Sequence, residues 1–156
     1  MSEESNQIQP LTITLDYLEL PLRCTYAGGN RSPSIRISNL NSESLAVMVF
    51  NPFIKSCCSF TPWIIWNIPP VTRIPEGIPP GSNVTSPIAA VQGINDYGEV
   101  GYHGPEPPAG EIQRYQFRVY GLDSMLDLPG GKTKDDLLSV LREHTIQYGE
   151  TVAICR

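Results

Sequence analysis

Prolines and glycines interrupt this chain so often that turns and short strands, rather than long helices, are expected over most of its length. The 156 residues include 15 prolines and 13 glycines, and a proline cannot supply the backbone donor that a helix interior or a central strand requires. Two continuous apolar runs, Ser44–Phe50 (SLAVMVF) and Trp63–Ile68 (WIIWNI), are each closed by a proline. Short runs rich in β-branched and aromatic residues predict strands that are buried on both faces.

Three other segments alternate between apolar and polar residues, which is typical of half-buried strands. They are Leu11–Leu20, Ser34–Ser38 and Ile112–Leu122, and a last short strand is expected at Thr151–Ile154. Between residues 69 and 96 the chain is rich in Pro, Gly and Ser. A connection of this length in a small domain is usually functional or well packed.

One stretch near the C-terminus predicts a helix. Thr133 can act as its N-cap, Asp136 stands three residues later as in a capping box, and an apolar face follows. Gly149 is expected to end the helix as its C′ residue. Many strands, a late helix and a final strand predict a mostly β fold, an antiparallel β-sandwich with a peripheral C-terminal helix. We expect one domain at residues 11–156, preceded by a polar tail at residues 1–10.

Charge and hydropathy exclude several classes of partner. The formal net charge is −5, and the lysines and arginines form no cluster. Nucleic-acid binding requires basic surfaces that neutralise phosphates, so nucleic acid is not expected as a partner. No stretch approaches 18 apolar residues and the N-terminus has no secretory pattern, so we expect no membrane insertion and a cytoplasmic location.

The cysteines do not predict a metal site. There are four of them, with no C-x-x-C pair, and only two histidines, so neither a metal nor another cofactor is expected. Cys57 and Cys58 are adjacent in sequence. They are either a redox or metal-capturing pair or two small apolar residues that fill a loop.

The stretch Gly101–Phe117 (GYHGPEPPAGEIQRYQF) joins a stiff Gly-Pro loop to the start of a strand. Alternation places Gln113 and Tyr115 on the face that Phe117 marks as the core face, where that face ends beneath the loop. Prolines preform such a loop and glycine N–H groups can bind an anion, which together predict a small pocket with a polar floor. The alternative is that Tyr115 only ties down the loop through its hydroxyl.

Four segments resemble the phosphatidylethanolamine-binding protein family, which includes Raf kinase inhibitor-like proteins and their prokaryotic relatives. They are Gly28–Ile35 (GGNRSPSI), Ala46–Pro52 (AVMVFNP), Pro62–Pro69 (PWIIWNIP) and Gln92–Asp123, which contains the Gly-Pro loop. The resemblance implies a β-sandwich with Greek-key connections. It also implies a pocket for small anions, such as phosphate, phosphorylethanolamine or acetate.

The residues that line the family's pocket are altered here. Asn51 and Phe53 stand at the positions of the two acids of the family's Asp-Pro-Asp motif, and Pro62 and Gln113 stand at its two histidine positions. Asn51 and Gln113 can still form hydrogen bonds, but they cannot change charge near neutral pH.

Other positions of the motif keep the family's character. These are Tyr102, Gly104, Tyr115 and the loop backbone near Glu106. His103 either replaces a lost imidazole or is a solvated loop residue, and the second interpretation is the one we expect.

The resemblance implies non-enzymatic binding of a small anion or phosphate-bearing ligand by Asn51, Gln113, Tyr115 and the loop. We do not expect an enzyme, because general acid–base catalysis requires a positioned titratable group. The alternative is a protein-interaction or regulatory scaffold, like the kinase-inhibitor relatives, with a vestigial pocket. The relatives also suggest a protein partner or a homodimer.

Overall fold

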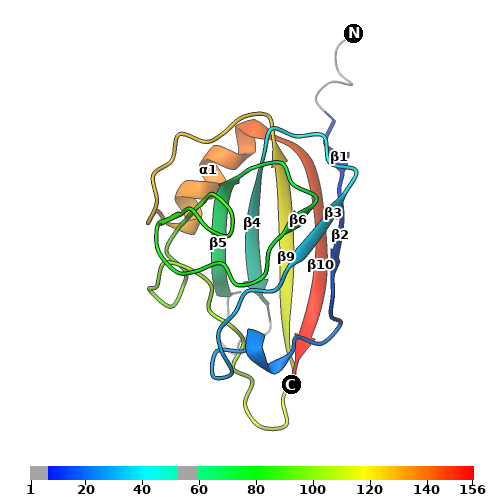
Figure 1. Ribbon diagram of the computed structural model, residues 1–156, viewed down its shortest axis with the longest axis vertical. Coiled ribbons are helices and arrows are strands. Elements are labelled where there is room, and N and C mark those ends of the chain that lie inside the picture. Colours follow the sequence, from blue (N-terminus) through cyan, green and yellow to red (C-terminus); the bar gives the residue numbers. More distant parts are fainter. Residues whose placement is uncertain (1–6, 53–59) are drawn as a thin grey trace.

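The computed structural model describes residues 7–52 and 60–156. In this part of the chain two β-sheets face each other, and a helix lies against the outer face of the larger sheet (Figure 1). The larger sheet has the order β1 (Gln9–Pro10), β10 (Thr145–Cys155), β9 (Gln113–Leu122), β4 (Ser44–Asn51), β5 (Phe60–Ile68), β8 (Ala90–Gln92) and β7 (Asn83–Val84). The smaller sheet has the order β2 (Thr12–Leu15), β3 (Ile35–Ser38) and β6 (Arg73–Ile74). The helix α1 spans Lys134–His144, and a short 3₁₀ helix spans Leu22–Cys24. The predicted mostly β sandwich with a C-terminal helix is confirmed.

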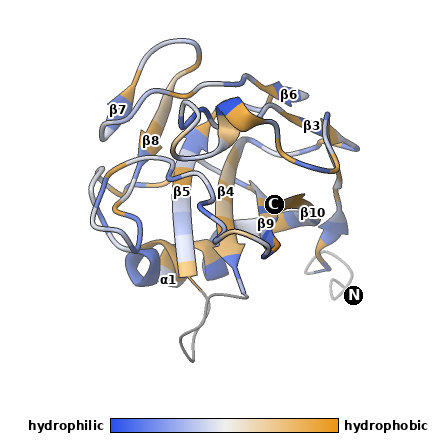
Figure 2. Ribbon diagram, turned by 90° about the horizontal axis from the view of Figure 1, so that it is seen from below, coloured by the Kyte–Doolittle hydropathy of each residue, from blue (hydrophilic) through white to orange (hydrophobic). Residues whose placement is uncertain are grey.

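The central strands β4 and β5 are buried on both faces, as their continuous apolar runs predict. One face contributes to the core between the sheets, where Val49 and Trp63 are fully buried. The other face packs Met48 and Trp66 against Leu137 of α1. In Figure 2 hydrophobic colours follow β4 through the middle of the molecule, whereas hydrophilic colours dominate α1.

The strands β9 and β10 form the longest antiparallel pair, from Gln113 opposite Cys155 to Leu122 opposite Thr145. On β9, buried residues alternate with half-exposed ones, so that Tyr115 and Phe117 face the core between the sheets. The predicted alternation of this strand is confirmed. At its other edge β10 pairs in parallel with β1, which contains Gln9 and Pro10.

Three predicted boundaries are wrong. The last strand, predicted at Thr151–Ile154, is the 11-residue strand β10. The segment Leu11–Leu20 forms a strand only at Thr12–Leu15. Its partner β3 has four residues, and Pro33, two positions before β3, has no N–H to continue the pairing. Gly149 does not end the helix, since it lies inside β10. A Cβ at Gly149 would lie 2.2 Å from the Leu11 carbonyl oxygen, so close backbone approach explains this glycine.

The predicted start of the helix is confirmed. The Thr133 hydroxyl accepts from the Asp136 N–H, and the Asp136 carboxylate accepts from the Thr133 N–H, as in a capping box. The helix ends at His144, where the Thr145 N–H donates to the Leu141 carbonyl and the chain continues directly into β10.

The long Pro-rich connection is well packed rather than loose. Gln92 on β8 is fully buried and accepts a 2.7 Å hydrogen bond from the indole N–H of Trp63. Its amide nitrogen donates to the carbonyls of Pro79 and Gly81. Within the described residues, no helix has the length and apolar character needed to cross a membrane.

Candidate functional site

The Gly-Pro loop lies at the end of the sandwich that also holds the C-terminus (Figure 1). Its first five residues, 101–105, are buried, and most of the following residues up to Gly110 are exposed. The His103 N–H donates to the Pro62 carbonyl of β5 at 3.1 Å, and the Tyr26 N–H donates to the Pro105 carbonyl at 3.2 Å. Backbone hydrogen bonds therefore hold the loop on both sides.

Two tyrosines fasten the loop from the core. The Tyr115 hydroxyl donates to the His103 carbonyl at 2.6 Å, and the Tyr102 hydroxyl donates to the Cys24 carbonyl at 2.8 Å. The interpretation that Tyr115 ties down the loop is therefore confirmed as a structural role. Burial raises the pKa of both phenols well above the ordinary value of 10.0, so neither loses its proton near neutral pH.

Asn30 is a clamp on the loop that the sequence interpretation missed. Its side-chain nitrogen donates to the Tyr102 carbonyl at 3.0 Å, and its side-chain oxygen accepts from the Gly104 N–H at 2.7 Å. Asn30 has a φ of 55°, in the left-handed region that asparagine tolerates. The Gly-Gly-Asn sequence was the available signal, because these residues favour such turns.

Gly104 is required by a close approach of two backbones. A Cβ at this position would lie 2.3 Å from the Cys24 carbonyl oxygen and 2.8 Å from the Tyr26 nitrogen. The expectation that its N–H is open to an anion is wrong, because that N–H already donates to Asn30.

His103 is buried, with 4% of its surface exposed, so the prediction of a solvated histidine is wrong. Its ring is stacked between Tyr26 and Tyr97, with centroid distances of 4.0 and 3.6 Å. Nδ1 lies 2.9 Å from a carboxylate oxygen of Glu99, and Nε2 lies 2.5 Å from one of Glu106. Both carboxylates receive a hydrogen bond only when both ring nitrogens carry a proton.

The two altered family positions that the structure describes on β4 and β9 lie together. Asn51 Nδ2 donates to Gln113 Oε1 at 3.3 Å. Asn51 is 2% exposed, and within residues 7–52 and 60–156 its Oδ1 has no hydrogen-bond partner. An unpaired buried acceptor is costly, which marks this strand end as a place where a ligand can gain an interaction. Phe53, Cys57 and Cys58 lie outside the described residues.

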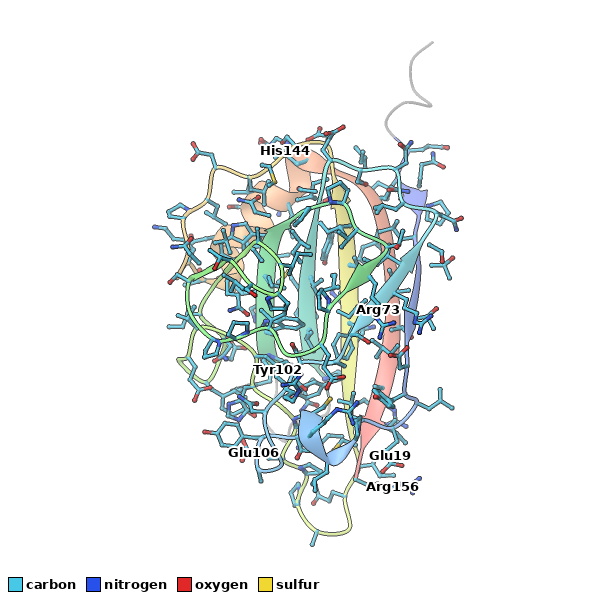
Figure 3. The ribbon with its side chains drawn as sticks, viewed as in Figure 1. Glu19, Arg73, Tyr102, Glu106, His144 and Arg156 are labelled. Atoms are coloured by element: carbon cyan, nitrogen blue, oxygen red, sulfur yellow. The ribbon has the colours of Figure 1, made fainter. Side chains whose placement is uncertain are left out.

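A cavity of about 310 Å³ lies between the Gly-Pro loop and the end of β10. Its lining includes Thr25, Pro105, Glu106, Cys155 and Arg156. Cys155 is the register partner of Gln113. Figure 3 shows Glu106 and Arg156 at this end of the molecule and His144 at the opposite end. The cavity therefore presents charges of both signs next to the predicted site residues.

The predicted residues thus divide into two groups. Tyr102, Gly104 and Tyr115 are engaged in holding the loop. Of the others, Glu106 lines the cavity, Gln113 is the strand neighbour of the lining residue Cys155, and Asn51 is hydrogen-bonded to Gln113. His103 connects the two groups through Glu106, and the tyrosines that enclose it come from positions that sequence spacing alone does not link to it.

Comparison with known proteins agrees with this architecture. The model of the phosphatidylethanolamine-binding protein family matches residues 14–156. A UPF0098 protein of Pyrococcus horikoshii is 44% identical over 138 residues, which are 86% of this chain and 69% of the relative. A UPF0098 protein of Pyrococcus abyssi is 43% identical over 138 residues, 86% of this chain and 77% of the relative.

Solved structures of relatives share the fold. YbcL of Escherichia coli has a TM-score of 0.81 at 27% identity, and the match covers 94% of this chain and 98% of that one. A phosphatidylethanolamine-binding protein homologue of Chlamydia trachomatis has a TM-score of 0.79 at 28% identity, over 94% and 97% of the two chains. The resemblance seen in the four sequence segments is confirmed, and the chain belongs to the phosphatidylethanolamine-binding protein family.

Proposed function

We propose that this protein binds a small phosphate-bearing ligand, without catalysing a reaction, in the cavity beside the Gly-Pro loop. The observation that carries the proposal is that the lining of a cavity of about 310 Å³ includes two residues of opposite charge, Glu106 and Arg156. Arg156 also forms an exposed 3.3 Å ion pair with Glu19, which a phosphate can replace or share. This volume lies at the lower end of the range for small-molecule sites. The loop is held by its own hydrogen bonds, so binding requires little ordering.

The charges favour a zwitterion over a bare anion. Glu99 and Glu106 both contact His103, and this group of three is net negative whichever protonation state the ring has. A ligand that carries an ammonium group as well as a phosphate reduces the repulsion, since the ammonium can approach Glu106 and the phosphate Arg156. We therefore expect phosphorylethanolamine to bind more tightly than inorganic phosphate.

The amide pair can adapt to such a ligand. In the part of the chain that the structure describes, Asn51 Oδ1 accepts no hydrogen bond, and an ammonium group can donate to it. If both amides turn end for end, Asn51 and Gln113 keep their mutual hydrogen bond and present a donor to a phosphate instead. The same side chains thus suit either end of the ligand.

A non-enzymatic role is supported by the chemistry of the neighbouring groups. Asn51 and Gln113 are neutral amides, and the buried phenol of Tyr115 has a raised pKa and is held by the His103 carbonyl. None of the three transfers a proton readily near neutral pH.

The thiols of Cys24 and Cys155 are free, which supports a reducing compartment such as the cytoplasm.

The proposal is tested by an NMR titration with phosphorylethanolamine, inorganic phosphate and ethanolamine. We expect saturable shifts at the side-chain amides of Asn51 and Gln113 and at the Glu106 backbone, with phosphorylethanolamine the tightest ligand. Gln113→Leu should weaken binding. Gln116→Leu is the matched control, because Gln116 lies on the same strand and faces the other side of the sheet.

A protein-interaction scaffold is the second candidate, and one observation favours it. Two groups that could hold a ligand, the Gly104 N–H and the Tyr115 hydroxyl, are already engaged within the protein. Tyr26 and Tyr97, at 42% and 38% exposed, present aromatic surface next to the loop. If none of the three ligands gives saturable shifts at tens of millimolar, the ligand-binding proposal is wrong and the scaffold is favoured.

A further inference from the structure

A second cavity, of about 480 Å³, lies away from the loop, between the C-terminal half of α1 and the outer face of β9 and β10. Its lining is mainly apolar and aromatic. The residues that matter here are Ile8, Tyr120, Leu138, Leu141, Arg142 and Tyr148. Figure 3 places His144, the last residue of α1, at the end of the molecule opposite Tyr102 and Glu106, so the proposed ligand site and this cavity are separate.

The cavity exists because α1 does not cover the whole outer face of the larger sheet. Leu137 and Leu141 of α1 pack over β4 and β5, where the buried apolar side chains lie. Beyond them the outer face continues to Tyr120 and Tyr148, which are direct register partners on β9 and β10. Their rings lie 5.1 Å apart and remain half-buried, so they form an aromatic wall that the helix leaves uncovered.

Among the described residues that line this cavity, Arg142 is the one cation. Within the described residues its guanidinium has no ion pair or side-chain hydrogen bond. Glu150, which is close enough to influence Tyr148, instead accepts a 2.6 Å hydrogen bond from the Tyr148 hydroxyl and lies 3.9 Å from Arg118. An apolar cavity bordered by an unpaired arginine suits a molecule with a hydrocarbon body and a single negative charge.

We propose that this cavity is a second binding site, for a small amphipathic anion such as an aliphatic carboxylate. Its hydrocarbon part contacts Leu138 and the rings of Tyr120 and Tyr148, and its carboxylate approaches Arg142. The volume lies within the range of small-molecule sites, and a mainly apolar lining with one charged group is typical of them. This inference does not depend on the function proposed for the loop site.

The first expectation concerns how apolar contacts contribute to the binding affinity. Octanoate is the probe, with hexanoate and octanol as its comparisons. Each additional buried methylene should tighten binding about fourfold, which corresponds to about 0.8 kcal/mol. Calorimetry should therefore show octanoate binding about tenfold or more tightly than hexanoate, and NMR shifts should map to α1, β9 and β10 rather than to residues 101–109.

The second expectation concerns how the charge of Arg142 contributes to the binding affinity. Arg142→Gln should weaken octanoate about two- to fivefold, the range for an exposed ion pair, and leave octanol unchanged. Arg73→Gln is the matched control, because Arg73 is also exposed but lies on the smaller sheet, and it should change neither ligand. Leu138→Gln should weaken octanoate and octanol alike, with the fold checked by circular dichroism.

Three results of the ligand titrations would overturn the proposal. They are the absence of saturable octanoate binding, equal loss of octanoate and octanol affinity in Arg142→Gln, and shifts confined to the loop. If the α1, β9 and β10 shifts instead depend on protein concentration without any probe, the face is occupied by a second copy of the chain and the small-molecule proposal is wrong.

Discussion

The hydroxyl of Tyr115 donates a hydrogen bond of 2.6 Å to the backbone carbonyl of His103, which lies 12 residues earlier in the chain. The donor stands on β9, in the core between the sheets, and the acceptor stands in the buried half of the Gly-Pro loop. One side chain thus connects the sandwich core to the loop that borders the proposed ligand cavity. The stiffness expected from the prolines is reinforced by the hydrogen bonds of the loop with the Tyr115 hydroxyl, the Asn30 side chain and the Pro62 carbonyl.

Removal of the Tyr115 hydroxyl should loosen the loop. Tyr115→Phe leaves the buried His103 carbonyl without this donor, so the free energy of unfolding should fall by about 1–3 kcal/mol. Urea denaturation measures the loss, and hydrogen exchange should be faster at residues 101–105. Tyr120→Phe, on the outer face of the same strand, is the control and should cost less than about 1 kcal/mol. Equal losses in the two variants would contradict the assigned role.

Substitution of Asn30 should lower the free energy of unfolding more than the same substitution of a comparable asparagine elsewhere in the chain. Asn30→Gly retains the left-handed backbone but removes both hydrogen bonds to the loop, and should cost about 2–3 kcal/mol in unfolding free energy. Asn39 also has a positive φ, of 69°, but its side chain makes one exposed hydrogen bond, to Thr12. Asn39→Gly should cost less than about 1 kcal/mol. The same cost at both positions would show that the clamp contributes nothing.

Gly104 should not tolerate a side chain. In Gly104→Ala the new Cβ meets backbone atoms of residues 24–26, which cannot move aside as a flexible side chain can. We expect a loss of more than about 3 kcal/mol in unfolding free energy. Gly110→Ala is the control, because Gly110 has a φ of 81° and open space around it, so that its new Cβ causes backbone strain without a clash. That variant should cost only about 1–2 kcal/mol, and a tolerated Gly104→Ala would exclude the close approach described for this loop.

The stacked ring of His103 should matter more than its nitrogens for stability. His103→Ala leaves a void between Tyr26 and Tyr97 and should cost about 2–4 kcal/mol in unfolding free energy. His103→Phe keeps a ring in the stack, and the carboxylates of Glu99 and Glu106, 47% and 48% exposed, can be hydrated. We therefore expect His103→Phe to retain more than half of the unfolding free energy that His103→Ala loses. Thermal unfolding of the two variants compares them directly, and a greater loss in His103→Phe would assign stability to the ion pairs instead.

Alkaline pH should destabilise the protein partly through Cys24. Burial raises the pKa of this thiol from its ordinary value of 9.0 to about 11. Because the native state holds the proton more tightly than the unfolded chain, this contribution to stability is complete below pH 9.0 and is lost as the pH rises to about 11. Urea midpoints from pH 7 to 11 measure the decline. In Cys24→Ala the urea midpoint should fall less steeply with pH above pH 9, although the buried tyrosines maintain part of the decline. An unchanged decline would show that Cys24 does not contribute to it.

Local sequence signals predicted the elements that depend on local chemistry. The apolar runs at Ser44–Phe50 and Trp63–Ile68 became β4 and β5, and Thr133 with Asp136 marked the start of α1. The end of the helix was misplaced because it is set by tertiary contacts. The chain after His144 is captured by pairing with β9, and this pairing overrides the helix-ending tendency of Gly149.

The site was harder to predict than the fold, because its contacts join distant residues. Asn51 and Gln113 were predicted as site residues from the resemblance, and the structure brings them within hydrogen-bond distance. His103 was expected in solvent, since nothing in its flanking residues shows that Tyr26 reaches it from 77 positions away. Alternation and turn chemistry identify the face on which a residue lies, but not which distant side chain meets it there.

The strand β9 runs without interruption from Gln113, beside the loop cavity, to Tyr120, in the wall of the second cavity. At about 3.4 Å per residue, these two side chains lie about 24 Å apart along a single strand. The Debye length at physiological ionic strength is only about 8 Å, so a charge held at one end is screened from the other. Because both cavities open to solvent, dissolved ions screen a ligand at one end of the sandwich from a ligand at the other, and titrations of the two ends should be additive.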